Sequence, residues 1–201
     1  MTVLLPEADA TVLARRAEIV AVLRRLVSAD AVIDDVARMR PYESDALTAY
    51  RQLPLVVVLP ETTLQVAAVL RWCHENGVRV VPRGAGTSLS GGALPLGDAV
   101  LLVLSKFSRI LEIDIEDRLA VVQSGVANLA ISAAAEPHGL YYAPDPSSQI
   151  ACSIGGNVAE NSGGVHCLKY GLTTHNVLGV RLVTMEGEIV DLGGRAFDSR
   201  G

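Results

Sequence analysis

Aromatic residues are scarce in this chain: they make up 4% of its 201 residues, whereas hydrophobic residues as a whole make up 50%. Charge is modest too, because 17 Lys and Arg residues stand against 22 Asp and Glu residues, for a formal net charge of −5. High apolar content with low net charge excludes a disordered chain. Nucleic acid is not expected as a partner, since binding it needs a basic face. The composition predicts a soluble globular protein of one domain, with or without a small appendage.

Long apolar runs are also missing. The best runs, Leu55–Leu59 and Ala99–Leu104, are far shorter than the about 20 residues of a membrane-spanning helix. The apolar stretch Thr11–Val27 is interrupted by charged residues, so it is not a secretory signal. The cysteines are odd in number and lack CxxC spacing, which predicts reduced thiols and a cytoplasmic location. They are Cys73, Cys152 and Cys167.

The N-terminal part predicts one amphipathic helix over Thr11–Val27, with apolar residues at helical spacing between arginines. The arginines are expected to form a solvated face, and docking of a partner is the alternative. Residues 34–54 are polar and contain Pro41 and Pro54, which indicates an irregular connector. We therefore expect a helical segment with a connector over residues 1–50 and a separate domain over residues 51–201.

Strands and helices are expected to alternate from residue 55 onward. Leu55–Leu59 predicts a buried strand, and a helix capped at Thr62 or Thr63 should follow as far as Gly77. Arg79–Val81 predicts a second strand, parallel to the first because crossovers are right-handed. Further expected elements are a strand over 100–104, hairpins over 110–123 and 177–192, and a helix over 129–138 that ends at Gly139. This mixture, with a β-rich second half, predicts an α+β fold.

The glycine-rich segment Pro82–Gly92 directly follows a predicted strand. Its glycines allow positive φ, and successive N–H groups in such a loop converge into an anion-binding nest. A Walker loop is excluded because no lysine follows its last glycines, and the dinucleotide fingerprint fails because Leu89 stands in the place of the third glycine. The segment predicts a phosphate or pyrophosphate loop of another kind, with a purely structural turn as the alternative.

A second segment, between Tyr141 and Gly171, is rich in Gly, Pro and Asn and shows no apolar periodicity. We expect a long loop here, neither an ordinary helix nor a strand, and such loops are usually functional or mobile. Paired glycines and asparagines expose polar backbone groups, and asparagine amides can bind a flat heteroatom-rich ring. The two segments together predict opposite walls of one long cofactor site. Nearby cysteines and histidines match no zinc spacing, so no metal site is expected.

These motifs resemble the FAD-binding domain of the vanillyl-alcohol oxidase and p-cresol methylhydroxylase (PCMH) flavoproteins. The resemblance lies in Arg83–Gly92, Pro144–Ser148, Ser153–Asn157 and Asn161–Gly164, in the right order and spacing. Within that family, Ala143–Tyr170 is similar to the branch of bacterial glycolate oxidase D subunits and D-lactate dehydrogenases. The resemblance implies a PCMH-type fold, in which two α+β subdomains clasp FAD after an N-terminal helical segment. The second subdomain is expected to be incomplete.

The resemblance also implies a set of cofactor contacts. The first segment would bind the pyrophosphate through backbone N–H groups, the second would run along the flavin and ribityl chain, and Ile189 would meet the adenosine half. Thr87 stands where many relatives carry a histidine bonded to the flavin, which implies noncovalent FAD. Asp145, between two prolines, could equally be a turn aspartate. The implied FAD-binding residues are Arg83, Gly84, Ala85, Gly86, Thr87, Ser88, Gly91, Gly92, Pro144, Asp145, Ser148, Ser153, Gly155, Gly156, Asn157, Asn161, Gly163 and Ile189.

The implied activity is oxidation of glycolate or D-lactate, with hydride transfer to FAD. No catalytic residue is assigned, because the substrate-binding part of such enzymes has no counterpart in the sequence. The implied partners are a small 2-hydroxy acid, a second flavin subunit and an iron–sulfur subunit, which could place the protein at the inner membrane. The polar end Asp198–Gly201 predicts a truncated domain. The alternatives are a non-catalytic fragment that binds flavin weakly and self-associates, or a loop for another nucleotide.

Overall fold

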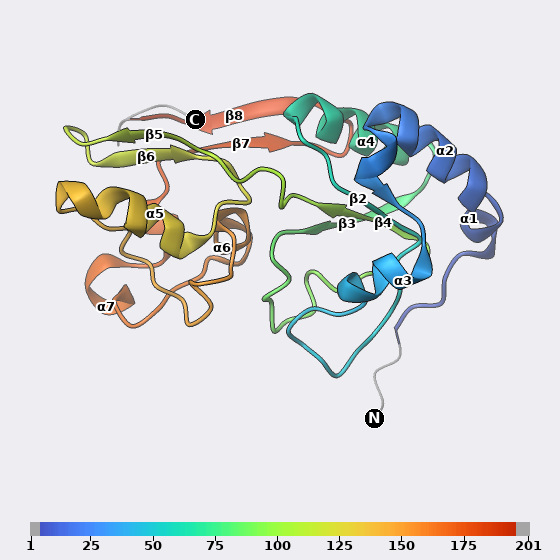
Figure 1. Ribbon diagram of the computed structural model, residues 1–201, viewed down its shortest axis with the longest axis horizontal. Helices are drawn as coiled ribbons and strands as arrows, with labels where there is room; N and C mark the ends of the chain where they lie inside the picture. The colour runs from blue at the N-terminus through green and yellow to red at the C-terminus, as the bar shows by residue number, and fades with distance from the viewer. Residues whose placement is uncertain (1–4, 196–201) are drawn as a thin grey trace. The chain divides into compact units, whose positions relative to one another are not determined.

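The computed structural model describes residues 5–195, so the predicted polar end Asp198–Gly201 lies outside the described residues. The chain forms two compact units (Figure 1). The first contains the described residues up to Leu104 together with Val183–Ile189, and the second contains Ser105–Leu182 and the described residues from Val190 onward. The boundary expected at residue 50 stays a prediction.

A four-stranded sheet in the order β1-β2-β4-β3 organises the first unit. Its strands are β1 (Val32–Ile33), β2 (Val56–Val58), β3 (Arg79–Arg83) and β4 (Ala99–Val103). β4 pairs parallel with both β2 and β3, whereas β1 pairs antiparallel with β2. The two predicted strands β2 and β3 are therefore parallel, as expected, but β4 lies between them. The crossover rule concerns direction and hand, and it leaves the position of a later strand open.

Helix α4 (Thr63–Glu75) follows β2 and begins where the sequence predicts. Thr62 caps it by accepting a hydrogen bond from the Gln65 N–H, and the Gln65 side chain accepts from the Thr62 N–H, which completes a capping box. Gly77, with φ of +66°, follows its C-terminal end. The helix buries one apolar side, which includes Val69 and Cys73, each 0% exposed.

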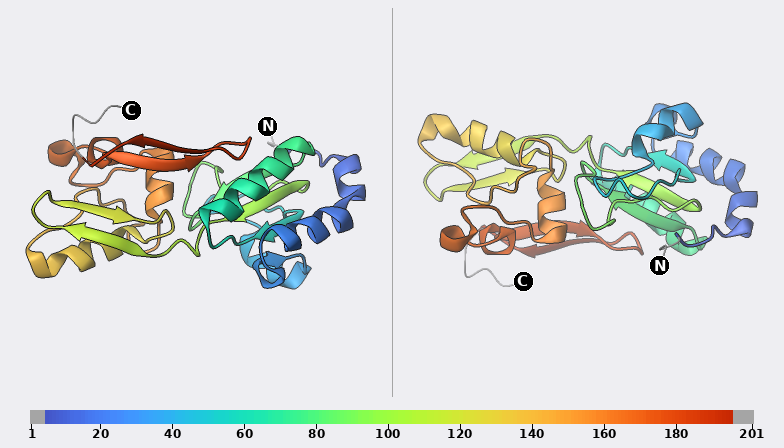
Figure 2. Two further views of the ribbon diagram at one scale, coloured as in Figure 1. Left: turned by 90° about the horizontal axis from the view of Figure 1, so that it is seen from above. Right: turned by 90° about the horizontal axis from the view of Figure 1, so that it is seen from below.

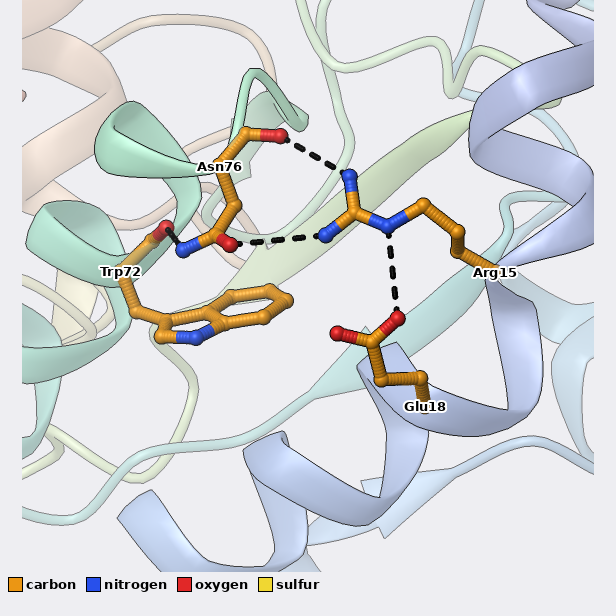
Figure 3. Close-up of polar contacts among 4 residues, drawn as sticks. All are labelled: Arg15, Glu18, Trp72 and Asn76. Atoms are coloured by element: carbon orange, nitrogen blue, oxygen red, sulfur yellow. Dashed lines mark hydrogen bonds and ion pairs between the residues drawn. The ribbon is translucent and has the colours of Figure 1, made fainter.

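The N-terminal segment forms two helices, α1 (Ala10–Ala14) and α2 (Arg16–Leu26), rather than the single helix expected. Arg15 separates them, and its guanidinium donates to the carbonyl and side-chain oxygens of Asn76 at 3.2 and 3.4 Å (Figure 3). Arg16 donates to the carbonyl of Leu55 at 3.1 Å. These two arginines bind protein groups, so the expectation of a wholly solvated arginine face is wrong.

The expected irregular connector also contains regular structure. Residues Val36–Met39 form α3, capped by the Asp35 carboxylate, which accepts from the Arg38 N–H at 3.0 Å. A 3-10 helix follows over Arg40–Tyr42, with Pro41 in its first turn. The short helices arise from a local cap and a proline with preset φ, signals too brief for periodicity to detect.

The second unit contains the hairpin β5 (Ile110–Asp114) and β6 (Leu119–Val122), which pair antiparallel as predicted. Helix α5 (Asn128–Ala135) follows, continues as a 3-10 turn and ends at Gly139, whose φ is +70°. A small core packs between these elements and consists of Val126, Ile131 and Ile154. Strands β7 (Gly179–Val183) and β8 (Ile189–Gly193) form the last hairpin, visible as the red pair in Figure 2. Its turn, part of the first unit, accepts hydrogen bonds from Arg71.

The expectation of one long loop between Tyr141 and Gly171 is wrong, because two helices lie there. They are α6 (Ile154–Glu160) and α7 (Cys167–Tyr170). Ser153 caps α6 through a hydrogen bond from the Gly156 N–H at 3.4 Å. A Cβ at Gly155 would lie 2.9 Å from the Ser124 carbonyl oxygen. The glycine therefore permits close packing within a helix, a role that composition alone cannot distinguish from a loop.

Candidate functional site

The side chain of Arg83 binds backbone carbonyls on either side of the first glycine-rich segment. Its side chain is buried, and its Nη1 atom donates to the carbonyl oxygens of Ser44 at 2.8 Å and Ala93 at 3.2 Å. The guanidinium carbon lies 5.8 Å from the centroid of the Tyr42 ring. Burial lowers the pKa of Arg83, and the charge of Asp45 opposes that shift. Arg83 thus links the two ends of the segment and places a buried positive charge next to the backbone at Gly86.

Gly86 meets two structural demands at once. Its φ of +73° lies in the left-handed region that favours glycine, and an added Cβ would collide with the Arg83 guanidinium. Glycine was expected here because it lets a ligand come close to the backbone. The structure adds a second reason, which is that Gly86 packs against the Arg83 guanidinium.

The backbone donors of the segment are available to a ligand. Within residues 5–195, the N–H groups from Gly84 to Leu89 donate to no protein acceptor, whereas the Ser90 N–H donates to Ser88 Oγ at 3.1 Å. Consecutive unpaired N–H groups next to a buried cation can bind an anion, and we call this stretch, Gly84–Leu89, the cradle. These residues fit the pyrophosphate of FAD. Thr87 lies within this cradle and is partly exposed.

Asn157, on α6, has an unmet donor in the second segment, as does the buried hydroxyl of Tyr142. It is 1% exposed, and its Nδ2 atom has no hydrogen-bond partner within the described chain. Asn128 is buried to the same degree, but its Nδ2 donates to the carbonyl of Pro144 at 2.9 Å. A buried amide without an acceptor costs free energy, and a flavin carbonyl would satisfy it. The sequence analysis missed Asn128, which positions Pro144.

Asp145 contacts a residue 21 positions away, so its carboxylate does more than stabilise a local turn. Its Oδ1 accepts from the His166 N–H at 3.2 Å, and its Oδ2 lies 2.8 Å from His166 Nδ1. A Cβ at Gly164 would collide with the Asp145 carbonyl, so glycine is needed for this approach. The pair joins two stretches of the second segment, and sequence spacing offered no sign of it.

The remaining predicted residues have roles in local structure. Asn161 ends α6 at φ of +51° and accepts from the N–H and hydroxyl of Thr174 at 3.0 and 2.7 Å. A Cβ at Gly163 would lie 2.5 Å from Leu172. Ile189, the first residue of β8, is 41% exposed and belongs to the first unit, as does Arg83–Gly92. The residues from Pro144 to Gly163 belong to the second unit. Direct contact of any of them with FAD stays a prediction.

Two chemical features are absent from the described part of the chain. No group of three or more His, Cys, Asp or Glu residues between positions 5 and 195 is placed to hold a metal ion. No helix in the same range is long and apolar enough to cross a membrane. The three cysteines are free thiols, as predicted.

Residues 54–193 match a known family, the FAD binding domain. The chain belongs to this family. FAD is therefore its cofactor, which confirms that expectation and favours FAD over another nucleotide. The p-cresol methylhydroxylase structure with substrate bound has a TM-score of 0.76 and 20% identity, over 96% of this chain and 37% of that one. The expected PCMH-type α+β fold is confirmed.

Relatives of known name are similar over most of this FAD-binding chain. The glycolate oxidase subunit GlcD of Escherichia coli K12 is 56% identical over 98% of the chain, and the D-lactate dehydrogenase of Anaerostipes hadrus is 39% identical over 85%. The chain spans 38% and 34% of the length of these two relatives. Their names are those of oxidoreductases. Neither match supports the alternative of a non-catalytic, self-associating fragment.

Proposed function

We propose that this chain is the FAD-binding portion of a flavin-dependent dehydrogenase or oxidase subunit that oxidises a small 2-hydroxy acid, glycolate or D-lactate. The observation that carries the proposal is the cradle of unpaired N–H groups after β3, in a chain 56% identical to a glycolate oxidase subunit. When bound, FAD supplies the acceptor for the hydride of the substrate α-carbon. The task of this chain is to bind and orient that acceptor.

The cofactor contacts follow from the donors described above. The N–H groups of Gly84–Ser88 with Gly91 and Gly92 hold the pyrophosphate, and the buried Arg83 guanidinium offsets part of its charge. The Asn157 amide donates to a carbonyl of the flavin ring. Attachment is noncovalent, because Thr87 provides no imidazole for a bond to the flavin. The other residues of the second segment shape the surface along the ribityl chain, and Ile189 meets the adenosine half.

The setting of the domain is part of the same proposal. An N-terminal helical segment over residues 1–50 precedes the FAD-binding domain over residues 51–201. The partners are the 2-hydroxy acid, a second flavin subunit and an iron–sulfur subunit. Partner subunits are proposed because a 56% identical relative is named as a subunit of glycolate oxidase. The location is cytoplasmic, with peripheral attachment to the inner membrane through the partner subunits.

An absorbance spectrum tests the proposal directly. The purified chain is incubated with FAD, desalted, and measured before and after denaturation. A flavin band that is retained on desalting and released by denaturation is the expected result. A band that stays with the denatured protein would contradict noncovalent attachment, and the absence of a band would overturn FAD binding by this chain.

A further inference from the structure

The connector between β1 and β2 contacts the first glycine-rich segment at two points. The carbonyl oxygen of Ser44 accepts a hydrogen bond from Arg83 Nη1 at 2.8 Å. A Cβ at Gly91 would lie 3.6 Å from the Leu47 side chain, so the connector also reaches the far end of the segment. The connector precedes residues 54–193, which match the FAD binding domain. Residues outside the matched domain therefore help to form the surroundings of the cradle.

Asp45, between these two contacts, is a buried carboxylate with one unmatched oxygen. It is 6% exposed, and its Oδ1 accepts from the Leu47 N–H at 2.9 Å, whereas its Oδ2 has no hydrogen-bond partner within residues 5–195. The neighbouring Glu43 forms ion pairs with two exposed arginines, at 3.5 and 3.6 Å. Asp45 forms no such ion pair in the described part of the chain. A buried charge without compensation is costly, so the buried cation Arg83 serves as its counter-charge.

The guanidinium of Arg83 lies directly against the cradle. Its Nη1 donates to backbone carbonyls, whereas Nη2 and Nε donate to no acceptor among the described residues. Both of these nitrogens would collide with a Cβ at Gly86, so they lie beside the backbone of the cradle. Burial lowers the pKa of Arg83 and the charge of Asp45 opposes that shift, so the two charges act on one another. The cradle therefore lies next to a balanced pair of charges.

A balanced pair affects ligands according to their own charge. The carboxylate of Asp45 cancels part of the attraction between Arg83 and an anion in the cradle, and the energy lost is proportional to the charge of that anion. The pyrophosphate of FAD is a diester with about one negative charge on each phosphate, whereas the free triphosphate of ATP carries about four in total at neutral pH. The loss is thus about twice as large for ATP. The N–H donors of the cradle are the same for both ligands.

We propose that Asp45 determines the specificity of the cofactor site, by favouring the doubly charged pyrophosphate of FAD over free nucleotides of higher charge such as ATP. Asp45 acts through the Arg83 guanidinium and does not itself contact the cofactor, so it is a positioning residue. This assignment rests on the proposed function, in which the cradle holds the pyrophosphate. It gives the connector a role in the choice of cofactor.

Titration of the purified chain with FAD, followed by flavin fluorescence, and competition by ATP test the assignment. Ionic strength is held constant and divalent cations are left out, because both screen the charges compared. Asp45→Asn removes the charge and keeps an oxygen for the Leu47 N–H. It should raise the affinity for FAD about threefold and that for ATP about tenfold. A purely structural role would lower both affinities instead.

Two further variants complete the experiment. Asp45→Ser also removes the charge, and its hydroxyl can still accept from the Leu47 N–H, so it replaces Asp45→Asn if the amide does not fit the buried position. Asp30→Asn is the matched control, since Asp30 is an exposed carboxylate of the same unit. It should change either affinity by less than about twofold.

Three results would overturn the proposal: the same ratio of FAD to ATP affinity in Asp45→Asn and the unchanged chain, a fall of both affinities, or no displacement of FAD by ATP from the variant. Absence of FAD binding by the unchanged chain would contradict the proposed function. Normal FAD binding with an unaltered preference in Asp45→Asn would contradict the role of Asp45 alone. The two failures are therefore distinguishable.

Discussion

The Nη1 atom of Arg83 donates a hydrogen bond to the carbonyl oxygen of Ser44, at 2.8 Å, although the two residues are 39 positions apart. The same nitrogen donates to Ala93, beyond the glycine-rich segment, at 3.2 Å. One buried cation thus links the connector between β1 and β2 with both ends of the loop that follows β3. The shape of that loop depends on this arginine as well as on its glycines.

Arg83→Met should therefore lower the free energy of unfolding by about 2–3 kcal/mol, because two buried carbonyls lose a charged donor. FAD affinity should fall as well, since the cation beneath the loop is removed. Urea unfolding and FAD titration measure the two effects. Arg38→Met is the control, because Arg38 is exposed, and it should change stability by less than about 0.5 kcal/mol. Equal stability of the two variants would show that Arg83 does not brace the loop.

Gly86→Val should abolish FAD binding, because the new side chain meets both a left-handed φ and the Arg83 guanidinium. Gly77→Val is a matched control: Gly77 has φ of +66°, but a Cβ there meets nothing within 4 Å. Both substitutions should destabilise the chain by about 1–2 kcal/mol through the backbone strain. FAD retention after desalting should be lost in Gly86→Val alone. Unchanged FAD affinity in Gly86→Val would refute the loop assignment.

Asn128→Ala should mainly lower the stability of the chain, whereas Asn157→Ala should mainly lower its affinity for FAD. Asn128 donates to Pro144, so its loss leaves a buried carbonyl unsatisfied and should cost about 2 kcal/mol of stability. Asn157 has an unpaired donor, so its truncation should cost less than about 1 kcal/mol in the FAD-free chain. Titration should show the larger loss of FAD affinity in Asn157→Ala. A stability loss in Asn157→Ala as large as in Asn128→Ala would argue that the amide is satisfied without FAD.

The thiols should differ in reactivity toward a disulfide reagent at pH 8. Burial raises the pKa of the Cys73 thiol from 9.0 to about 12, and the thiolate is the reactive form. Cys167 is partly exposed and Cys152 is buried, so one fast phase from Cys167 is expected, with the others reacting after unfolding. Cys167→Ser should lack the fast phase. A fast phase that persists in Cys167→Ser would contradict the burial of the other two thiols.

The same pKa shift predicts a loss of stability in alkaline solution. The folded chain keeps the Cys73 proton up to about pH 12, whereas the unfolded chain releases it above about pH 9. The free energy of unfolding should therefore fall as pH rises between these values, by at most about 1.4 kcal/mol per pH unit from this group. Urea unfolding at pH 8 and pH 10.5 measures the slope. Cys73→Ala should show a smaller decline than the unchanged chain.

Local signals in the sequence were sufficient for much of the fold. The helix cap at Thr62 or Thr63, the helix ends at Gly77 and Gly139, and the hairpins were predicted because each depends on a few adjacent residues. Helix α6 was missed because its paired glycines and asparagine resemble a loop in composition. The break between α1 and α2 was missed because its cause, the contact of Arg15 with Asn76, comes from another helix.

The sequence by itself determined the family, the cofactor and the two glycine-rich segments, because these depend on residue types in a fixed order. The tertiary structure decided which of those residues have groups left for a ligand. Arg83 is engaged by Ser44 and Asp145 by His166, whereas the Asn157 amide has no partner in the described chain. Hydrogen bonds between residues 21 or 39 positions apart depend on packing, which no local pattern contains.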